Sequence, residues 1–475
     1  MSRELQLAKR MVLMAFLLWP IATAEATSYY FPRRIRLWHK NADGALQVEN
    51  LDEKFDLSQP QPKREDVIRV AIYISGSKSQ TEFIDNFLES FPHLQKLTIT
   101  THDGPYPIGR SLSELAKLDS LNLQSAILEP AVLGACTNLQ DLKLRFSTKK
   151  RDPNAQPSES LGENLMKLSK LESLELSSFD KLDKLGSEDL IRAIQTLPNL
   201  KKLVLKYGFL SVDALHQWNS APFASKASLK ELHFSYLRLE SEKLSIIAAA
   251  MPQFTELTVL NLPGSAVTPE VADVLFPALS HTIQHLGLSQ TTPQDCHSYA
   301  HLIDLSRRAP NITTLDLSYS EIGDDGVANL VFAIQEGRLD NITKLLLTRA
   351  GITEKGVALL ATALPRLSKL DFLSLQENPL GDAGVKLLVN DLKKVTSLQR
   401  LDLCEVGISS ETTDYIRAQL GDKPGIQIRI GGKESDFGRF SFEHAGPCRV
   451  FSALGMKTWF DKNENWYEEY GGWLE

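Results

Sequence analysis

A single pattern recurs along most of this chain and limits what it can fold into. Thirteen segments carry the spacing apolar-x-x-apolar-x-apolar, and all 39 of these apolar positions are Leu, Ile, Val or Phe, whereas a 43% hydrophobic chain would supply about 17 by chance. A unit of this size cannot bury its own apolar face, so neighbouring units must stack into one elongated core. The thirteen segments begin at Val67, Leu94, Leu118, Leu139, Leu171, Leu200, Leu229, Leu257, Ile283, Ile312, Ile342, Leu370 and Leu398.

Each unit is predicted to form a strand, a turn and a helix. Alternation of apolar and polar residues places Leu315 and Leu317 inward and Asp316 toward solvent, as on a β-strand. A second signature, Gly-Val-x-x-Leu, follows in the later units, and its apolar spacing of three and four marks one face of a helix. Thr353 and Ser409 are placed to cap two of these helices. Residues 426–430 alternate again and predict a fourteenth strand.

The strand pattern, together with the helix signature at Gly326, Gly356 and Gly384, resembles the leucine-rich repeat family. The period of 28–30 residues in the later units is similar to the ribonuclease-inhibitor-like subclass. The resemblance covers residues 67–430 and implies an α/β solenoid, or horseshoe, of about 13–14 repeats, with a parallel β-sheet on the concave face and helices on the convex face. The family often has Asn or Cys at the ninth position of a unit, but here only Asn378 fits, so other groups must satisfy most of the turn amides.

The two ends of the chain leave the repeat. Lys9 and Arg10 precede nine apolar residues and then two Ala-x-Ala sites that end at Ala24 and Ala26, which predicts a secretory signal peptide over residues 1–26 and a secreted protein. An uncleaved anchor is the alternative, but a membrane-spanning helix needs about 20 apolar residues. Residues 27–66 are expected to cap the N-terminal end of the array. The aromatic-rich residues 431–475 are expected to cap the other end, with a partner-docking segment as the alternative.

The concave face is the predicted binding surface. Strand side chains project there at the third, fifth and seventh positions of each unit, and the eighth position lies where the chain leaves the sheet. Tyrosine and arginine are favoured in protein-binding hot spots, and the middle units carry such residues at these positions. The alternative is an ordinary solvated face. The candidate protein-binding residues are Arg145, Phe146, Lys202, Lys206, Tyr207, Glu231, His233, Tyr236 and Tyr319.

Histidine spacing gives no metal site, and we predict neither a metal nor a cofactor. His281 and His285 are four residues apart, but His285 falls on a strand while His281 lies in the preceding loop. His297 and His301 are also four apart, and no HExxH-type glutamate accompanies them.

Cysteines and sequons add three expectations. Cys136 is expected to be a free thiol in the core, whereas Cys404 and Cys448 form a disulfide if the C-terminal tail folds over the last coil. Asn311 and Asn341 begin sequons and are candidate glycosylation sites. The alternative is a structural role, because two other units have Asn at the same position without a sequon.

The function that these features favour is binding of another protein. A formal charge of −7 disfavours a nucleic acid partner, and we expect a monomer without stable membrane insertion. The chain contains no phosphate-binding loop and no catalytic signature, so we predict a secreted, non-catalytic protein that binds through its concave sheet. One alternative is a pathogen or symbiont effector that acts on a host protein, suggested by the basic residues 33–36. The other is an enzyme with a site in the tail around Glu443, His444 and Cys448.

Overall fold

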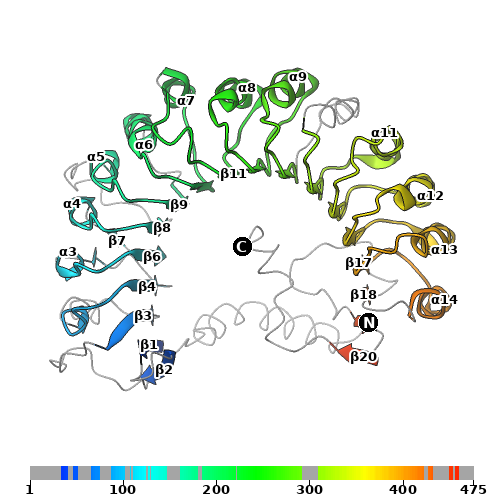
Figure 1. Cartoon of the computed structure of the whole chain (residues 1–475), viewed down its shortest axis with the longest axis horizontal. Helices are drawn as coiled ribbons and strands as arrows, with labels where there is room; N and C mark the ends of the chain where they lie inside the picture. Colours follow the sequence, from blue (N-terminus) through cyan, green and yellow to red (C-terminus); the bar gives the residue numbers. More distant parts are fainter. Residues whose placement is uncertain are drawn as a thin grey trace, which may run out of the picture.

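The predicted parallel sheet is present, and every predicted strand segment belongs to it. The computed structural model describes residues 34–40, 46–51, 66–74, 87–101, 107–108, 111–124, 127–128, 130–146, 161–179, 184–220, 222–290, 309–421, 426–431, 449–452 and 455–458. Within them, fourteen strands follow one another in parallel, one from each repeat and one from the closing segment, and the stack curves into an arc with the strands on its inner side (Figure 1).

The fourteen parallel strands keep one register, with the apolar positions of neighbouring units aligned. Leu203 of one strand faces Leu174 of the preceding strand and Leu232 of the next. The strands are β3 (Val67–Ile74), β4 (Lys96–Thr101), β6 (Ser120–Gln124), β8 (Asp141–Arg145), β9 (Ser173–Ser177), β10 (Lys202–Lys206), β11 (Glu231–Ser235), β12 (Val259–Asn261), β13 (His285–Gly287), β14 (Thr314–Asp316), β15 (Lys344–Leu346), β16 (Phe372–Ser374), β17 (Arg400–Cys404) and β18 (Gln427–Gly431).

Helices cover the outer side of the arc. Because packed helices need about 8–10 Å and paired strands only about 4.8 Å, the stack bends toward its strands. The described helices of this layer are α3 (Ser111–Glu114), α4 (Pro130–Ala135), α5 (Leu161–Leu165), α6 (Lys184–Thr196), α7 (Val212–Ser220), α8 (Ser241–Ala250), α9 (Pro269–Ala278), α11 (Gly323–Gln335), α12 (Glu354–Ala363), α13 (Gly381–Leu392) and α14 (Ser410–Leu420).

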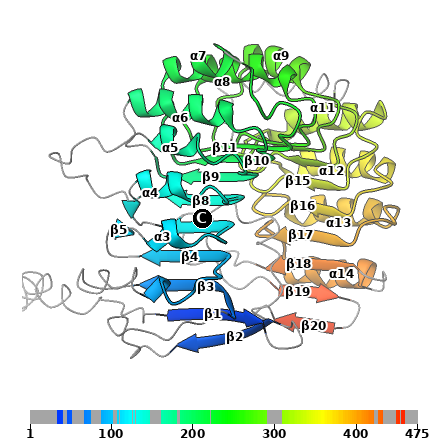
Figure 2. The ribbon, with the colours of Figure 1, turned by 60° about the vertical axis from the view of Figure 1, so that its left-hand side comes forward.

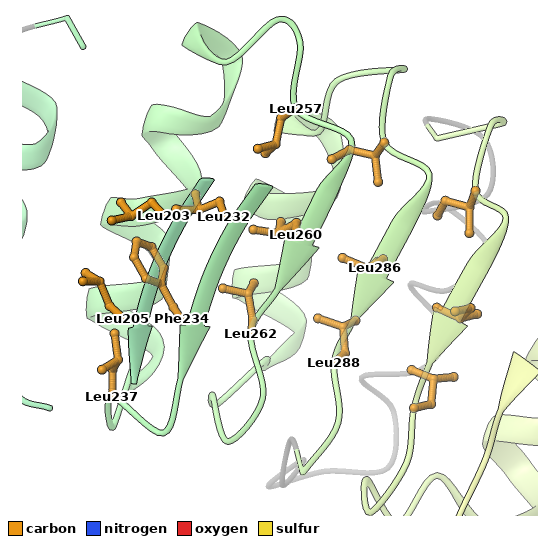
Figure 3. Close-up of a cluster of buried hydrophobic side chains, with 14 of the residues drawn as sticks. Leu203, Leu205, Leu232, Phe234, Leu237, Leu257, Leu260, Leu262, Leu286 and Leu288 are labelled. Atoms are coloured by element: carbon orange, nitrogen blue, oxygen red, sulfur yellow. The ribbon is translucent and has the colours of Figure 1, made fainter. Parts of the chain in front are cut away.

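The core is one continuous layer between strands and helices. The repeated leucines stack in rows from coil to coil, as Leu203, Leu232, Leu260 and Leu286 do in Figure 3. The largest side chain in it, Trp218, is fully buried against aromatic rings of the neighbouring coils. Burial of these side chains against adjacent units is the main source of stability in such a stack.

Antiparallel strands extend the sheet at both ends (Figure 2). At one end, β1 (Arg34–Lys40) pairs with β3 and with β2 (Leu46–Leu51). At the other end, β19 (Arg449–Ser452) pairs with β18 and with β20 (Gly455–Thr458). A separate two-stranded ladder joins β5 (Pro107–Ile108) to β7 (Ile127–Leu128). The predicted signal peptide lies outside the described residues, and none of the described helices is long and apolar enough to cross a membrane.

The expected turn and cap roles are confirmed where the sequence had assigned them. Asn378 is fully buried; its side-chain oxygen accepts from the amides of Ala350 and Ile352 at 3.0 Å each, and its nitrogen donates to the carbonyls of Leu347 and Leu375. Thr353 accepts from the amide of Lys355 and Ser409 from that of Thr412, each in the first turn of a helix. Other ninth positions use other groups, such as Ser320, whose hydroxyl donates to the carbonyl of Leu288 at 2.8 Å.

Candidate protein-binding site

Nine consecutive units place a residue in the left-handed region at the position where the chain leaves the sheet, and eight of these residues are not glycine. This conformation is unfavourable for a residue with a Cβ atom, so the neighbouring coils must hold it in place. The backbone amides do so, because Tyr207 donates to Ser235 and Tyr236 to Pro263 of the following unit. We call these nine residues the left-handed row: Ser178, Tyr207, Tyr236, Gly264, Gln290, Tyr319, Arg349, Glu377 and Glu405.

Two members of the left-handed row form an aromatic stack. The rings of Tyr207 and Tyr236 are parallel, with 5.0 Å between their centroids and 2° between their planes, and both are half-buried. Gly264 is the next member, and a Cβ atom there would lie 3.0 Å from the ring of Tyr236. Burial raises the pKa of both tyrosines, so their hydroxyls stay protonated at neutral pH and give each ring a polar tip.

Three of the other predicted residues lie at different distances from this stack. Arg145, at the end of β8, is exposed, and its charge acts on the Tyr207 hydroxyl. The ring of Phe146 is half-buried and packs against the hydrophobic core, and its part in protein binding stays a prediction. Tyr319 belongs to the same row, but it is three units from Tyr236, about 14 Å along the sheet.

Three predicted residues are part of a polar chain that crosses four strands. Lys202 on β10 contacts Glu231 on β11 at 2.7 Å, and Glu231 lies 3.3 Å from the His233 ring. The other nitrogen of His233 is 2.9 Å from the amide nitrogen of Asn261 on β12, whose oxygen is 3.0 Å from His285 on β13. The ring of His233 is buried, and its part in protein binding stays a prediction.

The hydrogen bonds of the polar chain run in one direction. Asn261 offers its NH₂ group to His233 Nδ1, which must therefore accept, and His233 Nε2 donates to Glu231. Asn261 offers its oxygen to His285, so His285 Nε2 donates. The His233 ring is neutral in this arrangement, because its Nδ1 accepts and so carries no proton. The polar chain is thus a fixed, mutually satisfied arrangement rather than a set of free binding groups.

The pKa values of the polar chain agree with this assignment. The hydrogen bond from His233, helped by Lys202, lowers the pKa of Glu231 to about 2. Burial lowers the pKa of His233 and lowers that of His285 to about 4, so both rings are neutral near pH 7. The network is therefore set up to hold one negative charge, on Glu231, beside Lys202.

A second cross-strand group accounts for Lys206. Its ammonium nitrogen is 3.0 Å from Glu175 on β9, and Lys143 on β8 approaches the same carboxylate at 4.0 Å. The sequence analysis did not select Glu175 or Asn261. Their strand positions face the concave side. The register between strands pairs Asn261 with His233 and makes Glu175 a diagonal neighbour of Lys206, so register was the signal that could have found them.

The described cysteines are buried in the core. Cys136 is buried and free, as expected, and burial raises its pKa to about 11, which keeps it an unreactive thiol. Cys404 is buried, but Cys448 lies outside the described residues, so their disulfide stays a prediction. Among the described residues no group of three or more His, Cys, Asp or Glu is placed to hold a metal ion.

The two sequon asparagines occupy a repeated structural position. Asn311 donates to the carbonyl of His281 at 2.9 Å, and Asn341 donates to that of Pro310 at 3.0 Å. Asn138 and Asn199, which have no sequon, make the same bond to the preceding coil. This tie between coils explains asparagine at all four positions, and glycosylation at Asn311 and Asn341 stays a prediction.

The chain is similar in sequence to known repeat proteins. No family model matches the chain. Ribonuclease inhibitor from Mus musculus is 38% identical over 105 residues, which are 21% of this chain and 23% of that protein. NACHT, LRR and PYD domains-containing protein 5 from Mus musculus is 30% identical over 226 residues, which are 42% of this chain and 19% of that protein. The chain spans about a quarter or less of the length of such curated relatives.

Solved structures also resemble the chain at low sequence identity. An LRR protein from Leptospira interrogans has a TM-score of 0.40 at 19% identity, and the match covers 74% of this chain and 93% of that chain. A chain of the mouse RP105/MD-1 complex has a TM-score of 0.43 at 18% identity, and the match covers 73% of this chain and 52% of that chain.

Proposed function

We propose that the chain, which resembles ribonuclease-inhibitor-like leucine-rich repeat proteins, is a secreted, non-catalytic protein that binds another protein through its concave face. The site is centred on Tyr207 and Tyr236 and includes Arg145. Mouse ribonuclease inhibitor, one of the relatives, is by its name an inhibitor, which supports a binding role for such a repeat array.

The aromatic stack is the observation that carries this proposal. Tyr207 and Tyr236 hold their rings 5.0 Å apart in a backbone conformation that costs free energy, and neither ring belongs to the buried core. Two rigid, half-exposed tyrosines lose little side-chain entropy when a partner covers them, and Arg145 adds an exposed cation. These are the properties of a hot spot in a protein interface.

The test is partner capture by the tagged full chain and by a variant that carries Tyr207→Ala and Tyr236→Ala. Proteins that the native chain retains should be lost from the double variant, because truncation of hot-spot residues typically costs about 2 kcal/mol or more each. The matched control is Phe332→Ala, which removes an aromatic ring that is 45% exposed on the outer helix α11. Equal capture by all three proteins would place the interface elsewhere.

His233 is left out of this test because its loss is expected to damage the structure. Alanine at this position would leave the amide of Asn261 and the carboxylate of Glu231 without their buried partner. Reduced capture by such a variant would not distinguish a contact with the partner from local disruption of the sheet.

Secretion and the absence of catalysis are further parts of the proposal. N-terminal sequencing of the protein recovered from the medium should begin after Ala24 or Ala26, and an intact Met1 would contradict cleavage. The tail residues of the alternative enzyme hypothesis, Glu443, His444 and Cys448, lie outside the described residues. An activity that His444→Ala abolishes would overturn the non-catalytic assignment.

A further inference from the structure

The N-terminal half of the concave face carries more cations than carboxylates, although the whole chain has a formal charge of −7. Across β3 to β11, six cationic side chains occupy strand positions of the concave side, against three carboxylates. We call this surface the basic face. Its cations are Arg69, Lys96, Lys143, Arg145, Lys202 and Lys206, and its carboxylates are Asp141, Glu175 and Glu231.

The carboxylates of the basic face do not balance its cations. Lys143 and Lys206 share Glu175, and Lys202 contacts Glu231. Arg145 is exposed beside the aromatic stack and forms no ion pair with any described residue. A ligand for this surface should therefore combine negative charge with apolar or aromatic groups that can cover Tyr207 and Tyr236.

The last segment of the chain has this composition. Residues 459–475 contain five carboxylates and one lysine, a formal charge of −4, together with six aromatic side chains. The carboxylates are Asp461, Glu464, Glu468, Glu469 and Glu475, and the aromatic residues are Trp459, Phe460, Trp466, Tyr467, Tyr470 and Trp473. The segment thus complements the basic face in both charge and aromatic character.

The segment is long enough to reach the aromatic stack. It follows β20, which is nine strand spacings from β11, or about 43 Å along the sheet. A straight path across the arc is shorter than the path along the strands. Seventeen residues span up to about 58 Å when extended, so the last aromatic residues of the chain can lie over Tyr236 and Tyr207.

We propose that residues 459–475 of this chain bind to its own basic face and cover the aromatic stack until a partner displaces them. The proposal rests on the proposed function, because it makes the same surface the site of both the tail and the partner. A partner would then need to compete with a segment of high local concentration, which raises the affinity required for capture.

Photo-crosslinking in the full chain tests this contact. Trp473, one of the last aromatic residues of the chain, is replaced by p-benzoylphenylalanine, and the products of irradiation are mapped by mass spectrometry. We expect crosslinks within one chain to peptides that contain Tyr207, Tyr236 or Arg145. The same photoreactive residue at Phe332, on the outer helix α11, is the control and should give none of these products.

Charge variants make the test specific. Glu468→Lys with Glu469→Lys should lower the yield of these crosslinks about fivefold, since each of two exposed charge pairs contributes roughly a factor of two or more. Adding Arg145→Glu should restore part of the yield. Far-UV circular dichroism and thermal unfolding of each variant check that the fold is unchanged. The proposal would be overturned by crosslinks between two chains or by crosslinks confined to β14–β18. It would also be overturned by a crosslink yield that does not change in the charge variants.

Partner capture separates this proposal from the proposed function. If both hold, the variant with Glu468→Lys and Glu469→Lys loses the intrachain crosslink and captures more partner than the native chain. If neither protein captures a partner while the crosslink is retained, only the proposed function is contradicted. If capture depends on Tyr207 and Tyr236 but the crosslink is absent, only the tail contact is contradicted.

Discussion

The two halves of the array are built on the same strand spacing but differ in how their coils are tied together. In the early half, α3, α4 and α5 are four to six residues long, whereas α11, α12 and α13 in the late half have ten to thirteen. The late half also has Asn378 in its turn and capped helices. The buried Asn378 turn thus belongs to one half, while the aromatic stack belongs to the other.

The left-handed row shows the same difference at the surface. Its early members include the stacked pair Tyr207 and Tyr236, whereas its last members are Arg349, Glu377 and Glu405. Arg349 approaches Glu377 at 4.0 Å, while burial and the neighbouring charge of Glu405 raise the pKa of Glu377. One backbone position is therefore reused for an aromatic surface in one half and for a charged surface in the other.

The largest effect is expected in the late half, for Asn378→Ala. The change removes the buried partner of the Ala350 and Ile352 amides and of the Leu347 carbonyl, so the free energy of unfolding should fall by about 3–5 kcal/mol. Denaturant unfolding measures it. Asn138→Ala, which removes an exposed bond in the early half, is the comparison and should cost about 1 kcal/mol or less. Equal losses would contradict the difference between the halves.

Acid should loosen the middle of the array, around β11–β13, first. The folded pKa of His285 is about 4, below its ordinary value of 6.5, so its contribution to stability is present above pH 6.5 and is lost as the pH falls toward 4. The lowered pKa of His233 acts in the same sense. We expect β11–β13 to lose about 1–2 kcal/mol of protection between pH 7.5 and 5 in hydrogen exchange. His285→Gln should lessen this loss, and a larger loss in β15–β17 would contradict it.

Substitutions at two glycines with positive φ distinguish the cost of backbone strain from the loss of support for the aromatic stack. Gly264→Ala and Gly323→Ala each force alanine into the left-handed region, at a cost of about 1–2 kcal/mol. A Cβ atom at Gly264 also meets the ring of Tyr236 at 3.0 Å, whereas nothing lies within 4 Å of one at Gly323. Only Gly264→Ala should weaken partner capture. Similar capture by both variants would show that the position of the Tyr236 ring does not matter.

The smallest effect is expected for the helix cap in the late half. Ser409 accepts from the Thr412 amide at 3.3 Å and donates to Asp382 of the preceding coil at 3.0 Å. Ser409→Ala should lower the free energy of unfolding by about 1 kcal/mol, and calorimetry should show a small fall in the melting temperature. Ser410→Ala, one residue further along, is the control. A loss above that of Asn378→Ala would reverse the proposed order.

The sequence was sufficient for the parts of the fold that depend on apolar spacing. Leu203 and its equivalents predicted the thirteen parallel strands of the repeats, and the Gly-Val-x-x-Leu signature predicted α11, α12 and α13. Asn378 was recognised because its position is fixed by the repeat. These features are local or periodic, so one sequence reveals them without knowledge of neighbouring coils.

The candidate site was less predictable because it depends on contacts between coils. The sequence predicted that Tyr207 and Tyr236 lie where their strands leave the sheet. It did not predict that their rings stack or that their backbone is left-handed. His233 lies at a strand position on the concave side, yet its ring is buried and bonds to Asn261, which the sequence of its own unit does not reveal. Burial on a curved face depends on the sizes of side chains in adjacent units, which the pattern of one unit does not contain.

The left-handed row has a consequence for engineering. Glycine would fit all nine positions without strain, yet eight carry side chains whose backbone amides are held by the following coil. These residues stand outside the repeated leucine rows, so their chemistry is separable from folding. The side chains of the left-handed row can therefore be substituted one at a time. Variants that bind new targets can be selected while the repeat scaffold stays unchanged.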